Sequence, residues 1–166
     1  MIVQLTPTEA MTVKMIELNE AINGLGIPEG EAMTAVDGSK KGAEFAVAKA
    51  LNLYPNLGGT LPVVPLVGRT HARVQVIWSK EPQASYNISR PRGDVFMVVT
   101  GTNPTFDICG FVMGKQLVKG SEGEYTVYHH VLTPMDEGFV FLQILNNTRD
   151  WTTAYSREGD QWKRKE

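Results

Sequence analysis

The run from Val95 to Val99 constrains the fold of this chain more than any other stretch. A strand that faces solvent on one side alternates apolar and polar residues, whereas this run is apolar throughout. It is also far too short to span a membrane. The run therefore predicts a central strand that is covered on both faces.

Several neighbouring segments have the pattern of further strands in the same sheet. A turn at 101–104 leads to a hairpin partner at 106–112, in which Gly110 is expected to form a bulge. Residues 73–78 alternate as a strand with one apolar face. Weaker strand signals lie at 63–67, 84–89, 125–132 and 138–145, and 114–119 is expected to form a short helix or turn.

The N-terminal segment has the signals of an amphipathic helix of about four turns. Thr6 and Glu9 have the spacing of a capping box, and Pro7 suits the first helical position. Glycines at 24 and 26 end the helix. Its apolar residues recur at helical spacing and are expected to pack in the core: Met11, Met15, Leu18 and Ile22.

After an expected loop at 27–38, a second helix begins near Ser39 or Gly42 and runs to about Tyr54. Its small apolar residues form a stripe that allows close packing on a sheet. Glu44 is the only carboxylate in its first turns. Two interpretations stay open, because Glu44 is either a metal-binding acid of an active site or a surface acid near a helix N-terminus.

The order of two helices followed by many strands indicates an α+β domain, with two N-terminal helices packed on a mixed, mostly antiparallel sheet. We expect one domain at 1–156 and a charged C-terminal tail at 157–166. The net charge of −2 gives no global attraction to nucleic acid. Local basic patches are possible on the second helix, at Lys40, Lys41 and Lys49, and at the turn 90–93.

The cysteine and histidine residues of this chain do not have the pattern of a disulfide, a reactive thiol or a metal site. The lone Cys109 excludes an intrachain disulfide and is expected to be buried and inert in its strand. His129 and His130 are adjacent, so on a strand they would face opposite sides. The chain shows no signal peptide and no membrane span, so we expect a cytoplasmic protein without a membrane partner.

Five segments in order resemble a family of small phage and prophage proteins. The helix at 42–54 resembles the family's "GxExAVAKALxxY" pattern, and the others are at 6–9, 59–68, 98–112 and 128–135. The family's layout is similar to that of PD-(D/E)xK nucleases. This resemblance implies a nuclease-like fold, in which carboxylates hold Mg²⁺ and the metal activates a water.

Carried onto this chain, the resemblance places the helix acid at Glu44 and the strand acid at Gln75, which is an amide. The other family positions fall on Leu66 and Ile77, which cannot bind a metal or act as a base. The resemblance therefore implies a degenerate nuclease centre and argues against an intact active site, while the question of enzymatic activity stays open. The protein would act by binding nucleic acid or a phage or host protein, in the cytoplasm of the host bacterium or in the virion.

Two alternatives remain. An active Mg²⁺-dependent nuclease would need migrated acids near Glu44, for which Asp94, Asp107 and Glu81 are candidates, and a replacement base at Arg69 or Arg73. A virion or assembly component without a nucleic-acid role is the other alternative. If nucleic acid binds, the expected contacts are at Lys40, Lys41, Arg69 and Arg73; the oligomeric state is open.

Overall fold

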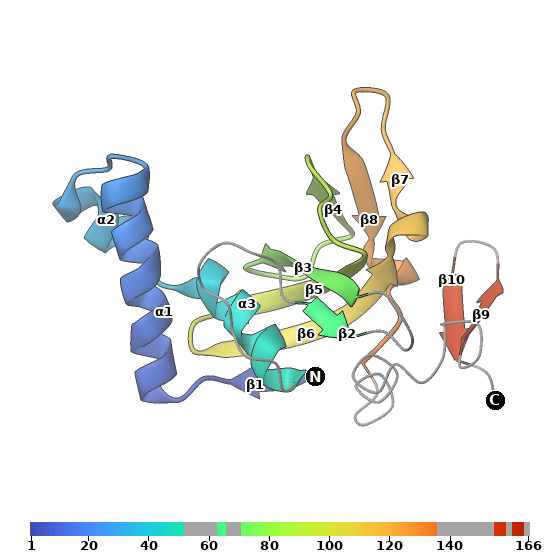
Figure 1. Cartoon of the computed structure of the whole chain (residues 1–166), viewed down its shortest axis with the longest axis horizontal. Helices are drawn as coiled ribbons and strands as arrows, with labels where there is room; N and C mark the ends of the chain where they lie inside the picture. The colour runs from blue at the N-terminus through green and yellow to red at the C-terminus, as the bar shows by residue number, and fades with distance from the viewer. Residues whose placement is uncertain (52–62, 66–70, 136–154, 159–160, 165–166) are drawn as a thin grey trace.

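The computed structural model describes residues 1–51, 63–65, 71–135, 155–158 and 161–164 (Figure 1). This part of the chain contains three α-helices and three β-sheets, so the α+β class is confirmed. A π-helix at Glu20–Gly24 and 3₁₀ turns at Gly114–Gln116 and His129–Val131 complete it. The elements are β1 Ile2–Gln4, α1 Pro7–Asn19, α2 Glu29–Ala35, α3 Ser39–Ala50, β2 Val63–Pro65, β3 His71–Ser79, β4 Ser85–Ile88, β5 Val95–Thr102, β6 Thr105–Met113, β7 Val118–Lys119, β8 Tyr125–Tyr128, β9 Tyr155–Glu158 and β10 Gln161–Arg164.

The main sheet has five strands in the order β1-β6-β5-β3-β2. Only β3 and β5 run parallel, and the other pairs are antiparallel, so the predicted mixed and mostly antiparallel sheet is confirmed. The predicted hairpin of β5 and β6 is also present. Its register shifts opposite Val98 and Val99, where Cys109 becomes the extra residue of a bulge next to Gly110.

Strand β5 lies at the centre of the sheet and is buried on both faces, as its sequence predicts. Val95, Met97 and Val99 belong to one hydrophobic core, which the helices cover. Phe96 and Val98 belong to a second core on the opposite face, under β4 and β8. Because successive side chains of a strand point to opposite faces, an apolar strand of this kind needs a cover on each side.

Helix α3 is the element that packs directly on the sheet. Its small residues Ala43, Ala46 and Val47 are fully buried in the first core. Gly42 allows the closest approach, because a Cβ atom at this position would lie 2.5 Å from Cζ of Phe106. The stripe of small residues therefore brings the helix backbone close to the sheet, as the sequence predicts.

The predicted pair of helices on the sheet is wrong in two respects. Helix α1 packs chiefly on α3, and α3 lies between α1 and the sheet (Figure 1). A further helix, α2, occupies the segment predicted as a loop. It begins after Pro28, and Glu29 and Glu31 in its first turn interact favourably with the helix dipole despite the polar, glycine-containing sequence.

The predicted burial of the N-terminal apolar stripe is wrong for Met11 and Met15, whereas Leu18 and Ile22 are partly buried. Met11 and Met15 are 59% and 55% exposed and line an open hollow of about 830 Å³, whereas Val13 is fully buried. The buried side of α1 instead carries Ala10 and Val13, which pack in the first core, and Glu17, which bonds to the start of α3. Small residues allow α1 to approach α3, and a carboxylate can occupy this face because it bonds to the backbone of α3.

The later strands do not join the main sheet, contrary to the expectation of one sheet. Strands β4, β8 and β7 form a separate three-stranded sheet, which covers the second core. Strands β9 and β10 form an antiparallel pair where the sequence predicts a charged tail, and the expected boundary at 156/157 falls inside β9. The strand expected at 138–145 lies outside the described residues.

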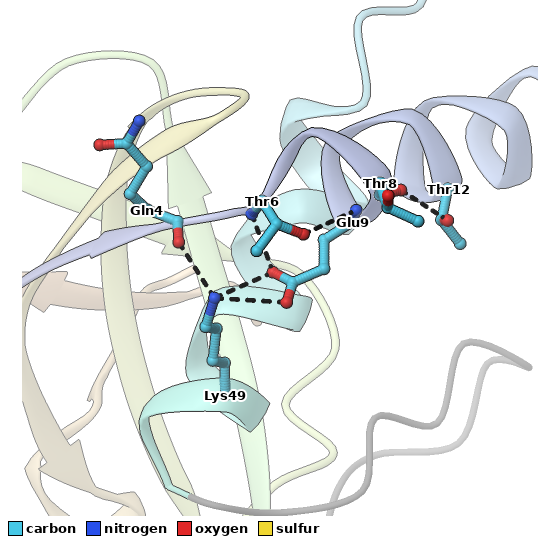
Figure 2. A network of polar contacts seen from close by, with 6 residues as sticks. All are labelled: Gln4, Thr6, Thr8, Glu9, Thr12 and Lys49. Carbon is cyan, nitrogen blue, oxygen red and sulfur yellow. Dashed lines mark hydrogen bonds and ion pairs between the residues drawn. The ribbon is translucent and has the colours of Figure 1, made fainter.

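A polar network joins β1, α1 and α3 at the start of α1 (Figure 2). The predicted capping box is present, since Glu9 N donates to Thr6 Oγ1 and Thr6 N donates to the Glu9 carboxylate. Lys49 of α3 donates to the same carboxylate at 3.1 Å and to the Gln4 carbonyl at 3.2 Å. Burial acts to raise the pKa of Glu9, but the bonds from Lys49 and Thr6 outweigh it and lower this pKa below its usual value.

Replacing Thr6 with Ala should lower the free energy of unfolding by about 1 kcal/mol, because the Glu9 amide loses its acceptor. Urea denaturation measures the change. Thr12→Ala is the matched control, since the Thr12 hydroxyl donates only to the Thr8 carbonyl one turn earlier (Figure 2). Equal losses for the two variants would show that the cap does not stabilise α1.

Candidate functional site

Glu44 is held by a lysine of its own helix. Its carboxylate lies 3.6 Å from Lys41 Nζ, and the same ammonium lies 3.2 Å from the Glu20 carboxylate. The Lys41 side chain is only 12% exposed. Burial acts to lower the pKa of Lys41, but Glu44 and Glu20 outweigh it and raise this pKa, so the ammonium stays charged.

This arrangement changes the predicted basic patch on α3. Lys41 is occupied by two carboxylates and Lys49 by Glu9, so neither ammonium is available for a phosphate. Lys40 is exposed and its charge acts on nearby Glu17. Of the two α3 lysines expected to contact nucleic acid, Lys41 is ion-paired, whereas Lys40 has no ion pair to a described residue.

The start of α3 is capped from α1. The Lys41 amide donates to the Glu17 carboxylate at 3.1 Å, and the Ser39 amide donates to Asp37 at 2.8 Å. Burial raises the pKa of Glu17 despite the bond from Lys41, and the charges of Asp37 and Glu20 raise it further. This tertiary cap joins the two helices at the cost of desolvating a carboxylate.

Glu44 and Gln75 do not meet, although the family resemblance places both in one centre. Gln75 lies opposite Phe96 in the register of β3 and β5, and Phe96 belongs to the second core. Residues directly opposite each other on paired strands point to the same face of a sheet. Glu44 lies on α3, which covers the other face, so the sheet separates the two side chains.

Gln75 holds a basic turn instead of a metal. Its Oε1 accepts from the Arg92 amide at 2.6 Å and from the Gly93 amide at 3.1 Å. Gly93 permits this approach, because a Cβ atom there would lie 2.8 Å from Gln75 Cβ. The amide group at the strand-acid position therefore fixes the turn 90–93 against β3.

The predicted metal ligand Asp94 is paired with the predicted base Arg73. Asp94 Oδ2 accepts from the Arg73 amide at 2.9 Å and lies 3.7 Å from Arg73 Nε. The structure thus brings Arg73, Gln75 and Asp94 to the same end of β3, without Glu44. Within the described ranges, His, Cys, Asp and Glu side chains form no group of three that could hold a metal ion. Arg69 and Leu66 lie outside those ranges.

A cleft of about 480 Å³ lies beside Gln75, between β3 and the end of β4. Two arginines of the basic turn line it, and both are exposed and without an ion pair to any described residue. None of the lining residues is a carboxylate. They are Gln75, Val76, Ile77, Trp78, Asn87, Ile88, Ser89, Arg90 and Arg92.

The amides in the cleft present donors to a ligand. Gln75 Oε1 is occupied by the two backbone amides, and Asn87 Oδ1 accepts from the Thr126 hydroxyl at 3.2 Å. Within the part of the chain that the structure describes, Gln75 Nε2 and Asn87 Nδ2 have no acceptor. Together with two guanidinium groups, they make a site that favours a negatively charged ligand.

The sequence indicates the basic turn at 90–93 but not its partners. Asn87 belongs to a short strand of a second sheet, and no local pattern places that strand beside β3.

The histidines also differ from prediction, because His129 and His130 lie on a 3₁₀ turn after β8. His129 Nδ1 lies 2.9 Å from the Tyr86 hydroxyl, where burial raises the pKa of Tyr86. No helix in the described residues is long and apolar enough to cross a membrane.

Replacing Glu17 with Gln should stabilise the protein more at pH 7 than at pH 4. The raised pKa means that the stability contributed by Glu17 is greatest below pH 4.5 and falls as the pH rises through the folded-state pKa. Glutamine keeps an acceptor for the Lys41 amide without a buried charge. Urea midpoints at the two pH values measure the difference, with Glu122→Gln at an exposed turn position as the control. An equal shift at both pH values would contradict the assignment.

Replacing Gln75 with Leu should release the basic turn. The amides of Arg92 and Gly93 lose their acceptor, so their hydrogen exchange should become about tenfold faster, which is the effect of one hydrogen bond. NMR exchange measures each amide. Gln75→Glu keeps both acceptor bonds and should keep slow exchange; unchanged exchange in Gln75→Leu would show that Gln75 does not hold the turn.

Comparisons with protein-family models, with curated proteins and with solved structures find no match for this chain. The resemblance to phage proteins and to PD-(D/E)xK nucleases stays a prediction from the sequence.

Proposed function

We propose that this protein binds nucleic acid without cleaving it, through the cleft between β3 and β4. Arg90 and Arg92 contact phosphate groups of the bound strand, and Gln75 holds the turn that carries them. The observation that carries the proposal is the lining of the cleft, which combines two arginines that have no ion pair to a described residue, two amide donors and no carboxylate.

The charges of the chain support an anionic ligand at this place in particular. The net charge is −2, so attraction to a polyanion must come from a local site. Arg73, Lys41 and Lys49 are neutralised by carboxylates, whereas the cleft arginines have no such partner among the described residues. Guanidinium groups bind phosphate oxygens in a bidentate geometry, which makes arginine well suited to this contact.

The contacts of the predicted catalytic residues support binding over cleavage. Glu44 is paired with Lys41 on the opposite side of the sheet from the cleft, and Asp94 accepts from Arg73. Gln75 Oε1 is already bonded to two amides. A nuclease-like ancestry and a phage origin fit this proposal, since the helix acid is kept and the strand acid is replaced by an amide.

Replacing Arg90 and Arg92 together with Gln should weaken binding of a single-stranded oligonucleotide by about 100-fold at low salt, at about tenfold for each lost charge-assisted contact. The slope of log K against log salt should become shallower by about 1.4, because two phosphate contacts no longer release counterions. Fluorescence anisotropy across a salt series measures both quantities.

The matched control is the double variant Lys14→Gln and Lys119→Gln, which removes the same charge from exposed positions outside the cleft. Equal losses in the two double variants would show that only net charge matters. A separate assay with Mg²⁺ or Mn²⁺ should detect no cleavage. Cleavage that is lost in Glu44→Ala would overturn the proposal in favour of a nuclease.

A further inference from the structure

We infer that the cleft holds one nucleotide unit of an unpaired strand, and that the protein selects single-stranded over duplex nucleic acid. This inference rests on the proposed function and adds the class of ligand. It is drawn from the size of the cleft and from the order of donors and apolar residues along its wall.

The size of the cleft fits a single small ligand. Its volume of about 480 Å³ lies within the range of pockets that enclose small molecules and cofactors, roughly 300–1,000 Å³. A nucleotide that projects from an unpaired strand can enter a space of this kind. The bases of a duplex are stacked and paired inside the helix, so only its outer phosphates would reach the rim.

The wall of the cleft is polar at one end and apolar at the other. Gln75 bonds to the turn that carries the arginines, so charge and donors gather at its end of the cleft. Ile77 lies two residues further along β3 on the same face, about 7 Å away, and packs against the second core. A nucleotide has the same order, with an anionic phosphate at one end and a flat base, whose faces can stack on apolar side chains, at the other.

Asn87 and Ser89 add uncharged polar groups to the lining of the cleft. Asn87 Oδ1 is bonded to Thr126, which orients the amide and leaves Nδ2 for a base or sugar oxygen. Both residues lie on the exposed face of β4 and its extension. Because they alternate with the buried Ile88, they line the cleft without contributing to the core.

The inference is tested with the whole protein and defined probes. We expect a fluorescent deoxythymidine 12-mer to bind at least about tenfold more tightly than the same strand annealed to its complement, because only the unpaired strand inserts a nucleotide. Thymidine monophosphate should compete at lower affinity, and inorganic phosphate should compete more weakly still because it lacks the base.

Asn87→Asp tests the cleft without a change in volume. The carboxylate removes the Nδ2 donor and adds a negative charge inside the cleft while the Thr126 contact is kept, so single-strand affinity should fall about tenfold and by more than duplex affinity. Asn23→Asp, on the exposed π-helix, is the control for added charge. Ser89→Asp repeats the test at a second exposed position if the first variant is unstable.

The outcomes separate this inference from the proposed function. Equal affinity for single strand and duplex would overturn the single-nucleotide inference and leave nucleic-acid binding in place. No binding of either form would overturn both. Competition by a polyglutamate peptide as strong as that by the oligonucleotide would assign the cleft to acidic protein segments and overturn both. An unchanged single-strand affinity in Asn87→Asp would place the ligand elsewhere.

Discussion

The structure depends on the burial of β5 on both faces. One set of its side chains completes the core under α3, and the alternate set completes the core under β4 and β8. Neither layer could be removed without exposing a row of large apolar side chains to water, at a cost of about 1.5–3 kcal/mol for each. The second cover also creates the cleft, because Tyr86 and Ile88 anchor β4 above β3 through this core.

The contact between α1 and α3 combines apolar packing with a charged group, unlike the apolar cores on either side of β5. Helices α1 and α3 pack against each other through small residues. Glu17 lies in this contact, and its carboxylate caps the start of α3 by accepting from the Lys41 amide. The apolar side chains that a sequence pattern assigns to the core, Met11 and Met15, remain exposed instead. Small side chains on the buried side of α1, such as Ala10 and Val13, let the helix pack closely, which favours this side over the one that carries the methionines.

The acid that the sequence singles out and the cleft that the structure contains lie on opposite faces of the sheet. Glu44 is the clearest acid in the sequence, yet it is neutralised by Lys41 and lies away from the cleft. Gln75 is at the place where the family resemblance expects a strand acid, and in the structure its amide oxygen supports a turn. Arg90 and Arg92 are visible in the sequence as a basic turn, whereas Asn87 becomes part of the site only through tertiary contacts.

The sequence by itself determined the features that depend on neighbouring residues: the capping box of Thr6 and Glu9, the small-residue face of α3, the doubly buried β5 and its hairpin with β6. Each follows from local periodicity or from a short hydrogen-bonded motif. Tertiary structure alone decided which face of α1 is buried, how the later strands divide between sheets, and which residues line the cleft. These outcomes depend on which of several surfaces, distant in sequence, pack against each other. The spacing of residues along the chain does not determine that choice.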